Sequence, residues 1–358
     1  MLEQWHASAG AAVTTLRERE YMDAADALFG SGDREARQAA FAEKMRGLHE
    51  QYPDDGEAAV FYALALLRRG AQLSEAPMPR RLLAARILDG VLKREPHHPG
   101  ALHYLIHALD DPAHASLALP AARAYETVAL DFPHALHMPS HIYLRLGLWD
   151  DVARANSRAY AASTDPSKNA ADGPDLHALE WLHFARVQQG RLEAAGALLQ
   201  SMRGIAANGN AAAARAATRM SARAIFAAQA WDRARLPDEK PYLDLYLSYA
   251  NALCAAGMGA VERGDAATAN QAAQNIAALR RPATDANLPS WSRRLDAMAK
   301  AIEAESARRR GDVRGARALF DEAVAAITAV EGEEVDGDQS LPNPVKPVRE
   351  LYGEALLG

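Results

Sequence analysis

Small and apolar residues recur at helical spacing along most of this chain, and glycines, prolines and short polar stretches separate the segments that carry them. The β-branched runs that are typical of strands are missing. This pattern predicts an all-α protein. The expected helices cover residues 8–29, 33–51, 58–69, 79–94, 116–130, 149–162, 175–189, 191–202, 208–230, 242–263, 265–279, 290–310, 312–327 and 348–357, and two further helices open at Pro99 and Pro133.

Four glycines mark turns between consecutive helices. Each stands just before a segment with small and apolar residues at helical spacing. They are Gly147, Gly190, Gly264 and Gly311. Glycine is favoured just past the end of a helix because it adopts positive φ without strain. The spacing therefore predicts helices that are connected in pairs by short turns.

One phrase occurs twice in the first half of the chain. Residues 99–107 read PGALHYLIH and residues 133–141 read PHALHMPSH, so both copies match P-x-A-L-H-x-x-x-H. Every matching position is 34 residues apart. The proline that opens each copy suits the first turn of a helix, where its missing N–H needs no partner. We therefore expect two equivalent helices that carry equivalent histidines.

A period of 34 residues is that of the tetratricopeptide repeat, and the chain resembles this family over most of residues 57–327. The segments HHPGALHYLIHALDDP, HALHMPSHIYLRLGLWDDVARAN and LHALEWLHFARVQQGR resemble a His-rich bacterial subgroup. The resemblance implies an α-solenoid, a superhelix of antiparallel helix pairs whose first helices line a concave wall. We expect N-terminal helices over 1–56, His-bearing repeats over 57–205, further repeat-like pairs over 206–340, and a Pro-rich loop with a terminal helix over 341–358.

The repeated histidines predict a metal site. Residues four apart lie on one face of a helix, so His103 pairs with His107 and His137 pairs with His141. Neighbouring first helices lie roughly 8–10 Å apart, so four imidazoles from two such helices can converge on one ion. Of the 12 histidines, 10 fall within residues 97–183, so this clustering is not a general richness in histidine.

An all-imidazole set without thiolates suits a transition metal, copper first and then iron or zinc. His177, on the next first helix, is the fifth candidate ligand. Glu180 is able to bind the ion, to accept a proton from a ligand or to act as a base, and its plain alternative is an exposed helix charge. Tyr104, beside the first histidine pair, is a candidate for redox chemistry, with packing as its alternative.

Three further residues are candidates around this site. His98 and His134 stand at the openings of the two His-bearing helices. Each is a ligand, a hydrogen-bond donor to a ligand, or a residue that starts the helix. Asp111 is able to orient the ring of His107 without itself binding the ion or, as the alternative, to cap the turn that follows the helix.

Pro139 lies inside the second His-bearing helix. An interior proline removes a backbone hydrogen bond and costs ~3 kcal/mol or more in an ordinary helix. We expect a kink between His137 and His141, which changes the angle at which the two rings approach. Met138 next to it is a soft copper ligand or, by the simpler interpretation, a core methionine.

The chain has 358 residues and a formal net charge of −6, which gives no electrostatic footprint for nucleic acid. No apolar run approaches the roughly 18 residues that span a membrane, so no membrane partner is expected. Residues 1–12 lack the features of a signal peptide, which predicts a cytoplasmic protein unless a leader has been removed. Cys254, the only cysteine, lies in an apolar run and is expected to be a buried structural thiol.

These observations favour a metal-dependent enzyme, oxidative or hydrolytic, that acts on a small-molecule substrate on the concave face. Two other classes stay open. One is a scaffold whose groove holds a peptide or a partner helix, with the histidines as polar contacts or a pH-sensitive patch. The other is a metal carrier or sensor without turnover. Neither a Gly-rich phosphate loop nor a Ser-His-Asp arrangement is found, so nucleotide chemistry and triad hydrolysis are poorly supported.

Overall fold

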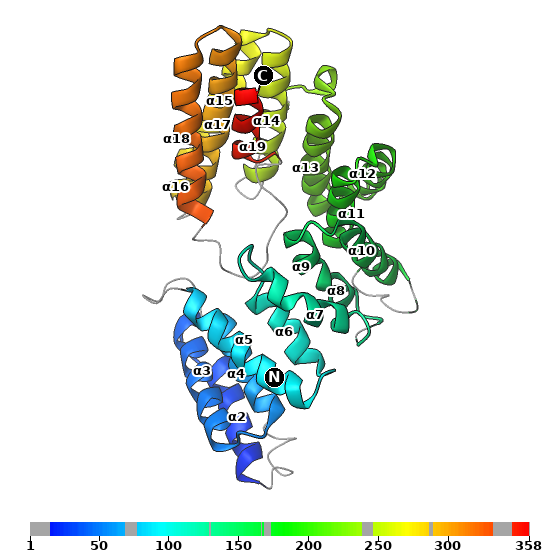
Figure 1. The fold of residues 1–358 in the computed structure, drawn as a ribbon, viewed down its shortest axis with the longest axis vertical. Coiled ribbons are helices and arrows are strands. Elements are labelled where there is room, and N and C mark those ends of the chain that lie inside the picture. The colour runs from blue at the N-terminus through cyan, green and yellow to red at the C-terminus, as the bar shows by residue number, and fades with distance from the viewer. Residues whose placement is uncertain are drawn as a thin grey trace. The chain divides into compact units, whose positions relative to one another are not determined.

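The computed structural model describes residues 15–68, 77–128, 130–165, 167, 173–237, 246–285, 289–331 and 346–357, and all regular secondary structure in these ranges is helical (Figure 1). The predicted all-α class is therefore confirmed. The first part of the predicted helix 8–29 and most of the Pro-rich loop lie outside the described residues.

The helices before residue 148 are α2 (Leu16–Phe29), α3 (Arg34–Gln51), α4 (Gly56–Arg68), α5 (Pro77–Arg94), α6 (Pro99–Ala108), α7 (Ala115–Tyr125), α8 (Pro133–His137) and α9 (Pro139–Arg145). Those that follow are α10 (Trp149–Thr164), α11 (Leu176–Gln188), α12 (Leu192–Ala207), α13 (Ala211–Ala228), the 3-10 helix η1 (Trp231–Arg233), α14 (Tyr246–Glu262), α15 (Ala266–Ala278), α16 (Arg280–Asp285), α17 (Pro289–Arg309), α18 (Val313–Glu331) and α19 (Val348–Leu357).

Helices that are adjacent in sequence pack against one another as antiparallel pairs (Figure 1). The pairs α2–α3, α4–α5, α6–α7, α12–α13, α14–α15 and α17–α18 all show this contact. Helices two positions apart also touch: α4 contacts α6, α11 contacts α13, and α15 contacts α17. Each pair thus buries its apolar stripe against its own partner and against the next pair, which is the tetratricopeptide-like packing expected from the sequence.

The structure confirms the four predicted glycine turns. Each of these glycines has a positive φ: 68° at Gly147, 69° at Gly190, 75° at Gly264 and 83° at Gly311. The residue after each glycine donates its N–H to the carbonyl five residues earlier, as Leu148 does to Tyr143 over 2.9 Å. This bond ends the helix and reverses the chain into the next one.

The chain divides into two compact units, the first ending at Leu148 and the second beginning at Trp149. The division falls inside the segment 57–205 that was predicted as one set of His-bearing repeats. Helices α2 to α9 belong to the first unit and α10 to α19 to the second, so the two histidine pairs share a unit and His177 belongs to the other.

In the first unit, α6 buries most of its residues and leaves its two histidines partly exposed. The residues of α6 that are less than 9% exposed are Ala101, Leu102, Leu105, Ile106 and Ala108. His103, Tyr104 and His107 lie between these buried positions and are partly exposed. On α9 the corresponding packing is tighter, since Ile142 and Tyr143 are fully buried.

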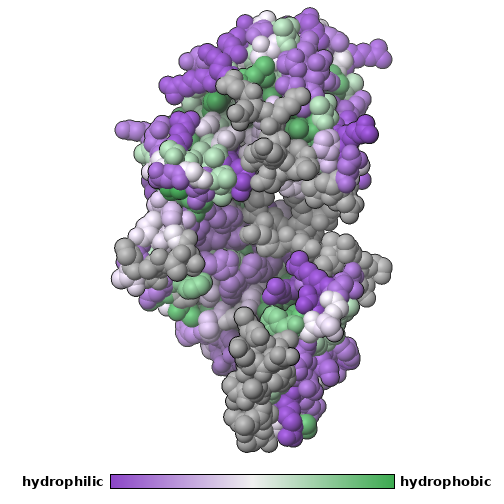
Figure 2. All heavy atoms as spheres, turned by 180° about the vertical axis from the view of Figure 1, so that it is seen from behind, coloured by the Kyte–Doolittle hydropathy of each residue, from purple (hydrophilic) through white to green (hydrophobic). Residues whose placement is uncertain are grey.

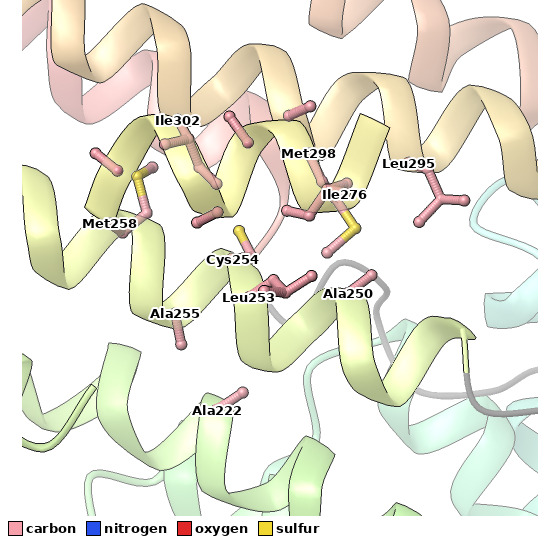
Figure 3. Close-up of a cluster of buried hydrophobic side chains, with 14 of the residues drawn as sticks. Ala222, Ala250, Leu253, Cys254, Ala255, Met258, Ile276, Leu295, Met298 and Ile302 are labelled. Atoms are coloured by element: carbon pink, nitrogen blue, oxygen red, sulfur yellow. The ribbon is translucent and has the colours of Figure 1, made fainter. Parts of the chain in front are cut away.

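A hydrophobic core cluster of the second unit combines alanines with larger apolar side chains from α13 to α17 (Figure 3). A Cβ added at Gly257 would lie 2.6 Å from Ile302 Cδ1 and 3.0 Å from Ala272 Cβ, so the close approach of these helices requires glycine there. Cys254 lies among these residues and is 2% exposed, and its burial raises the pKa of the thiol to about 12. The prediction of a buried structural thiol is confirmed.

Hydrophilic residues cover much of the face shown in Figure 2, and hydrophobic residues appear there in small separate groups. Large exposed apolar side chains, such as Phe132 (68%) just before α8 and Val313 (70%) on α18, lie far apart in the sequence. In the described ranges, no helix is long and apolar enough to cross a membrane.

Candidate metal centre

His98 caps α6 and thereby sets where the first histidine pair begins. Its Nδ1 accepts a hydrogen bond from the backbone N–H of Ala101 over 3.3 Å, and its Nε2 lies 3.4 Å from Glu57 Oε1. Pro99 follows as the first residue of the helix. Of the three interpretations of His98, the structure supports the last, a residue that starts the helix. Its Nδ1 accepts the hydrogen bond that caps α6, and its Nε2 faces Glu57.

His103 and His107 point their Nε2 atoms at each other over 3.0 Å. The rings are stacked, with centroids 4.9 Å apart and planes at 22°. Two imidazole nitrogens bound to one ion at about 2.0–2.1 Å lie roughly 2.8–3.4 Å apart for bond angles of about 90–110°. The pair therefore has the spacing of a metal chelate, and without an ion the same distance fits one N–H···N hydrogen bond.

His134, from the first turn of α8, completes a group of three with this pair. One nitrogen from each of His103, His107 and His134 lies within 4.8 Å of the other two. The rings of His103 and His134 are 5.2 Å apart, and His134 is exposed while the other two are partly buried. These three residues, called the open histidine group below, form a site with one solvent-facing side.

Two tyrosines border the open histidine group. The hydroxyl of Tyr125 lies 3.2 Å from His103 Nδ1, so this nitrogen has a partner while Nε2 faces His107. The ring of Tyr104 lies 5.3 Å from that of His103. Burial raises the pKa of both phenols, that of Tyr125 to about 12, so both are neutral at pH 7.

The second pair, His137 and His141, is buried and differently arranged. Their Nε2 atoms are again 3.0 Å apart, but the ring planes meet at 80°. His141 Nδ1 lies 2.9 Å from Asp110 Oδ2, and Arg145 donates to the other oxygen of Asp110 over 2.8 Å. These four residues, called the buried histidine group below, form a chain of hydrogen bonds.

The four repeated histidines thus fall into two groups rather than around one point. The ring centroids of His107 and His141, one from each group, are 6.2 Å apart. In each pair the Nε2 atom faces the histidine four residues away in the sequence, because the i,i+4 spacing of a helix brings those two side chains together. The single four-histidine centre expected from the sequence is replaced by two neighbouring groups.

The helix is interrupted just before Pro139, where the sequence predicts a kink. The helix breaks into α8 and α9 at Met138, and the N–H of His141 bonds to the carbonyl of Met138, three residues back, over 3.2 Å. Proline cannot donate the bond that would continue α8. Met138 itself is fully buried, as the simpler interpretation of this residue expected.

The electrostatics keep the first histidine pair in the form that binds metals. Burial, followed by the neighbouring histidines, lowers the pKa of His103 to about 4 and that of His107 to about 3. For Asp110, burial by itself raises the pKa of the carboxyl group, but its interactions with His141 and Arg145 outweigh burial and lower this pKa to about 2. At pH 7 the imidazoles of the first pair are neutral and the carboxylate is ionised.

Asp111 serves the turn after α6 instead of the ring of His107. Its Oδ1 accepts from the backbone of Ala113 and His114 and lies 2.8 Å from His114 Nδ1. Arg81, 3.6 Å from the other oxygen, donates to the backbone carbonyl of His107. The structure therefore supports the capping alternative for this residue.

The remaining candidates lie on α11 in the second unit. The ring of His177 is 5.4 Å from that of Trp181. Glu180 is 7% exposed and binds Arg219 through both carboxylate oxygens, with Arg223 at 3.7 Å. The exposed helix charge considered for Glu180 is wrong, because neighbouring helices bring two guanidinium groups to it.

No family model matches the chain, and no curated protein sequence matches it. Among solved structures, yeast Tom70 is similar with a TM-score of 0.46 and 13% sequence identity, over 90% of this chain and 65% of that chain. This chain thus spans about two thirds of the length of Tom70.

Sequence reasoning did not single out Arg145 and did not link Asp110 to His141, although a signal for this link was present. His141 stands 34 residues after His107, and Asp110 follows His107 by three residues. Asp110, just past the end of α6, is therefore about one helical turn beyond His107, the residue that matches His141. The register alone could have placed a carboxylate beside the second histidine pair.

Proposed function

We propose that this protein binds a transition metal ion through His103, His107 and His134. The observation that carries the proposal is the convergence of three imidazole nitrogens within 4.8 Å, two of them at chelate spacing. Three neutral imidazoles without thiolate suit copper first and then iron or zinc. The only cysteine is buried in the core of the second unit and offers no alternative ligand.

We further propose that the ion serves a metal-dependent enzyme that acts on a small molecule by oxidative or hydrolytic chemistry. Three protein ligands leave a coordination position open, which distinguishes catalytic sites from closed structural ones. The exposed ring of His134 places that position beside solvent. The bound ion would supply a Lewis acid or a redox centre, and Tyr125 would hold His103 in the tautomer that presents Nε2.

A scaffold without metal is the second candidate, and the fold favours it. Tetratricopeptide-like helix pairs commonly present a groove to a peptide or a partner helix. In that case the 3.0 Å contact between His103 and His107 is an N–H···N hydrogen bond between polar groove residues. A metal carrier or sensor would bind the ion at the same site as the proposed enzyme but would not turn over a substrate.

Element analysis of the full chain, purified without a His tag, separates these possibilities. We expect at least one bound ion per chain and its loss in the His103→Ala/His107→Ala double variant. The matched control is His97→Ala, since His97 is exposed just before the cap of α6 and belongs to neither group. A metal-free protein that also fails to take up added Cu²⁺ or Zn²⁺ would refute the proposal.

The predicted ligand His177 and the predicted catalytic groups Glu180 and Tyr104 need separate variants in the same assay. His177→Ala is expected to lower the bound metal content, and Tyr104→Phe to leave it unchanged while lowering turnover. Glu180→Gln needs a parallel unfolding measurement, because Arg223 beside it is 3% exposed and would lose its counter-charge.

A further inference from the structure

We infer that the first unit holds a second metal ion at His137 and His141, and that Asp110 is the positioning residue for this site. The inference rests on the proposed function, since it extends the metal chemistry of the open histidine group to the buried one. It makes the centre a two-ion centre, with one ion near solvent and one enclosed.

Asp110 fixes the orientation of the His141 ring. An ionised carboxylate only accepts hydrogen bonds, so the 2.9 Å contact between Asp110 Oδ2 and His141 Nδ1 requires the proton on Nδ1. In the neutral ring the lone pair of His141 then lies on Nε2, the atom that faces His137 over 3.0 Å. A carboxylate behind a histidine in this way is the usual support of a metal ligand.

Arg145 fixes the carboxylate in turn. It donates to Oδ1 of Asp110 over 2.8 Å, while Oδ2 is left for His141. Asp110 is 5% exposed and His141 is 2% exposed, so water does not compete for these contacts. The partly buried guanidinium, the buried carboxylate and the buried imidazole form one row that orients a ligand nitrogen.

His137 completes the pair with matching polarity. Its Nδ1 lies 3.4 Å from Ser140 Oγ, so the hydroxyl is able to accept the Nδ1 proton and leave Nε2 as a lone pair. Two Nε2 lone pairs then face each other at chelate spacing inside the protein. Without an ion, the same distance fits one N–H···N hydrogen bond, as in the first pair.

Two ions fit this arrangement better than one shared ion. Each Nε2 is already directed at its i,i+4 partner, and the ring centroids of His107 and His141, one from each group, are 6.2 Å apart. The buried pair is enclosed and has the carboxylate support, whereas the open group includes an exposed ring. The enclosed ion is therefore expected to exchange more slowly than the open one.

Titration of the metal-free full chain with Co²⁺, followed by its visible absorption and by element analysis, tests the inference. We expect two ions per chain, with one lost in His103→Ala/His107→Ala and the other lost in His137→Ala/His141→Ala. Helical circular dichroism of each variant checks the fold. One ion in the wild type, lost only with the first pair, overturns the second site and leaves the proposed function standing. No ion in the wild type overturns both.

The variant Asp110→Asn tests the positioning role of Asp110. We expect affinity to fall 10–100-fold for one of the two ions, with a shift of the Co²⁺ absorption band of that site alone. Asp110→Glu should recover part of the affinity. Asp111→Asn is the matched control, because Asp111 bonds to the turn and to His114. An unchanged band and affinity in Asp110→Asn would overturn the positioning role, whatever its effect on stability.

Discussion

Histidines at nearby positions do different things in this protein because their burial and their hydrogen-bond partners differ. His97 is exposed, His98 caps a helix, and His103 faces another imidazole. In the second unit, His183 is fully buried, and within the described residues neither of its ring nitrogens has a hydrogen-bond partner. Residue type alone therefore does not identify a ligand, whereas residue type with a converging partner does.

The buried ring of His183 predicts a pH dependence of stability. Burial, and then the charge of Arg223, lowers its pKa from 6.5 to about 3. Between these values the unfolded chain binds the extra proton, so the free energy of unfolding falls as pH drops below about 6.5. We expect His183→Met to remove roughly 1–2 kcal/mol of that fall between about pH 6.5 and 5. Urea unfolding at both pH values measures it, and equal losses for the two proteins would contradict it.

At the scale of the helix, the two histidine pairs show what one proline changes. On the unbroken α6 the rings of His103 and His107 stack at 22°. Across the break at Pro139 the rings of His137 and His141 meet at 80°, although their Nε2 atoms are equally far apart. The kink thus turns one ring relative to the other while the distance is kept.

Pro139→Ala is expected to restore a continuous helix from α8 to α9, because alanine supplies the missing N–H and is the best helix former. Helical circular dichroism should stay equal or rise. Co²⁺ affinity of the buried pair should fall at least 10-fold, since the pair loses its present ring orientation. Retained affinity with increased helicity would show that the kink serves packing alone.

Two glycines near α12 give a matched test of the turn chemistry. Gly190 has a φ of 69°, whereas Gly204 lies inside α12 with no atom within 4 Å of an added Cβ. Gly190→Ala should lower the free energy of unfolding by about 1–2 kcal/mol, because alanine is strained at positive φ. Gly204→Ala should raise it by about 0.5–1 kcal/mol, since alanine favours the helix. Denaturant unfolding of both variants measures the opposite signs.

At the scale of the whole molecule, both histidine pairs lie in one of two compact units, each with its own core. Metal binding should therefore stabilise the two units unequally. Ligand at 100 times its Kd adds about 2.7 kcal/mol to the unit that binds it.

Hydrogen exchange of the full chain with and without Zn²⁺ tests this expectation. Peptides from α6, α8 and α9 should become more protected, while peptides from α14 to α18 should not change. The His103→Ala/His107→Ala variant is the control and should lose the added protection on α6. Equal protection across both units would contradict a local metal site.

Much of the fold follows from local features that the sequence encodes directly. Helix faces come from the spacing of small and apolar residues, and the turns come from glycines that adopt positive φ. The kink at Pro139 comes from a missing N–H, and the pairing of His103 with His107 comes from the rise of a single helix. Each of these depends on residues less than two turns apart, so the sequence by itself determined them.

The grouping of the candidate ligands was decided only by the tertiary structure. Asp110 meets His141 across 31 residues, and Arg219 meets Glu180 across 39. The addition of His134 to the first pair and the separation of the second pair depend on how α6, α8 and α9 pack. Such contacts depend on interhelical distances and crossing angles. Those are set by the sum of many small packing interactions, and no single spacing in the sequence records them.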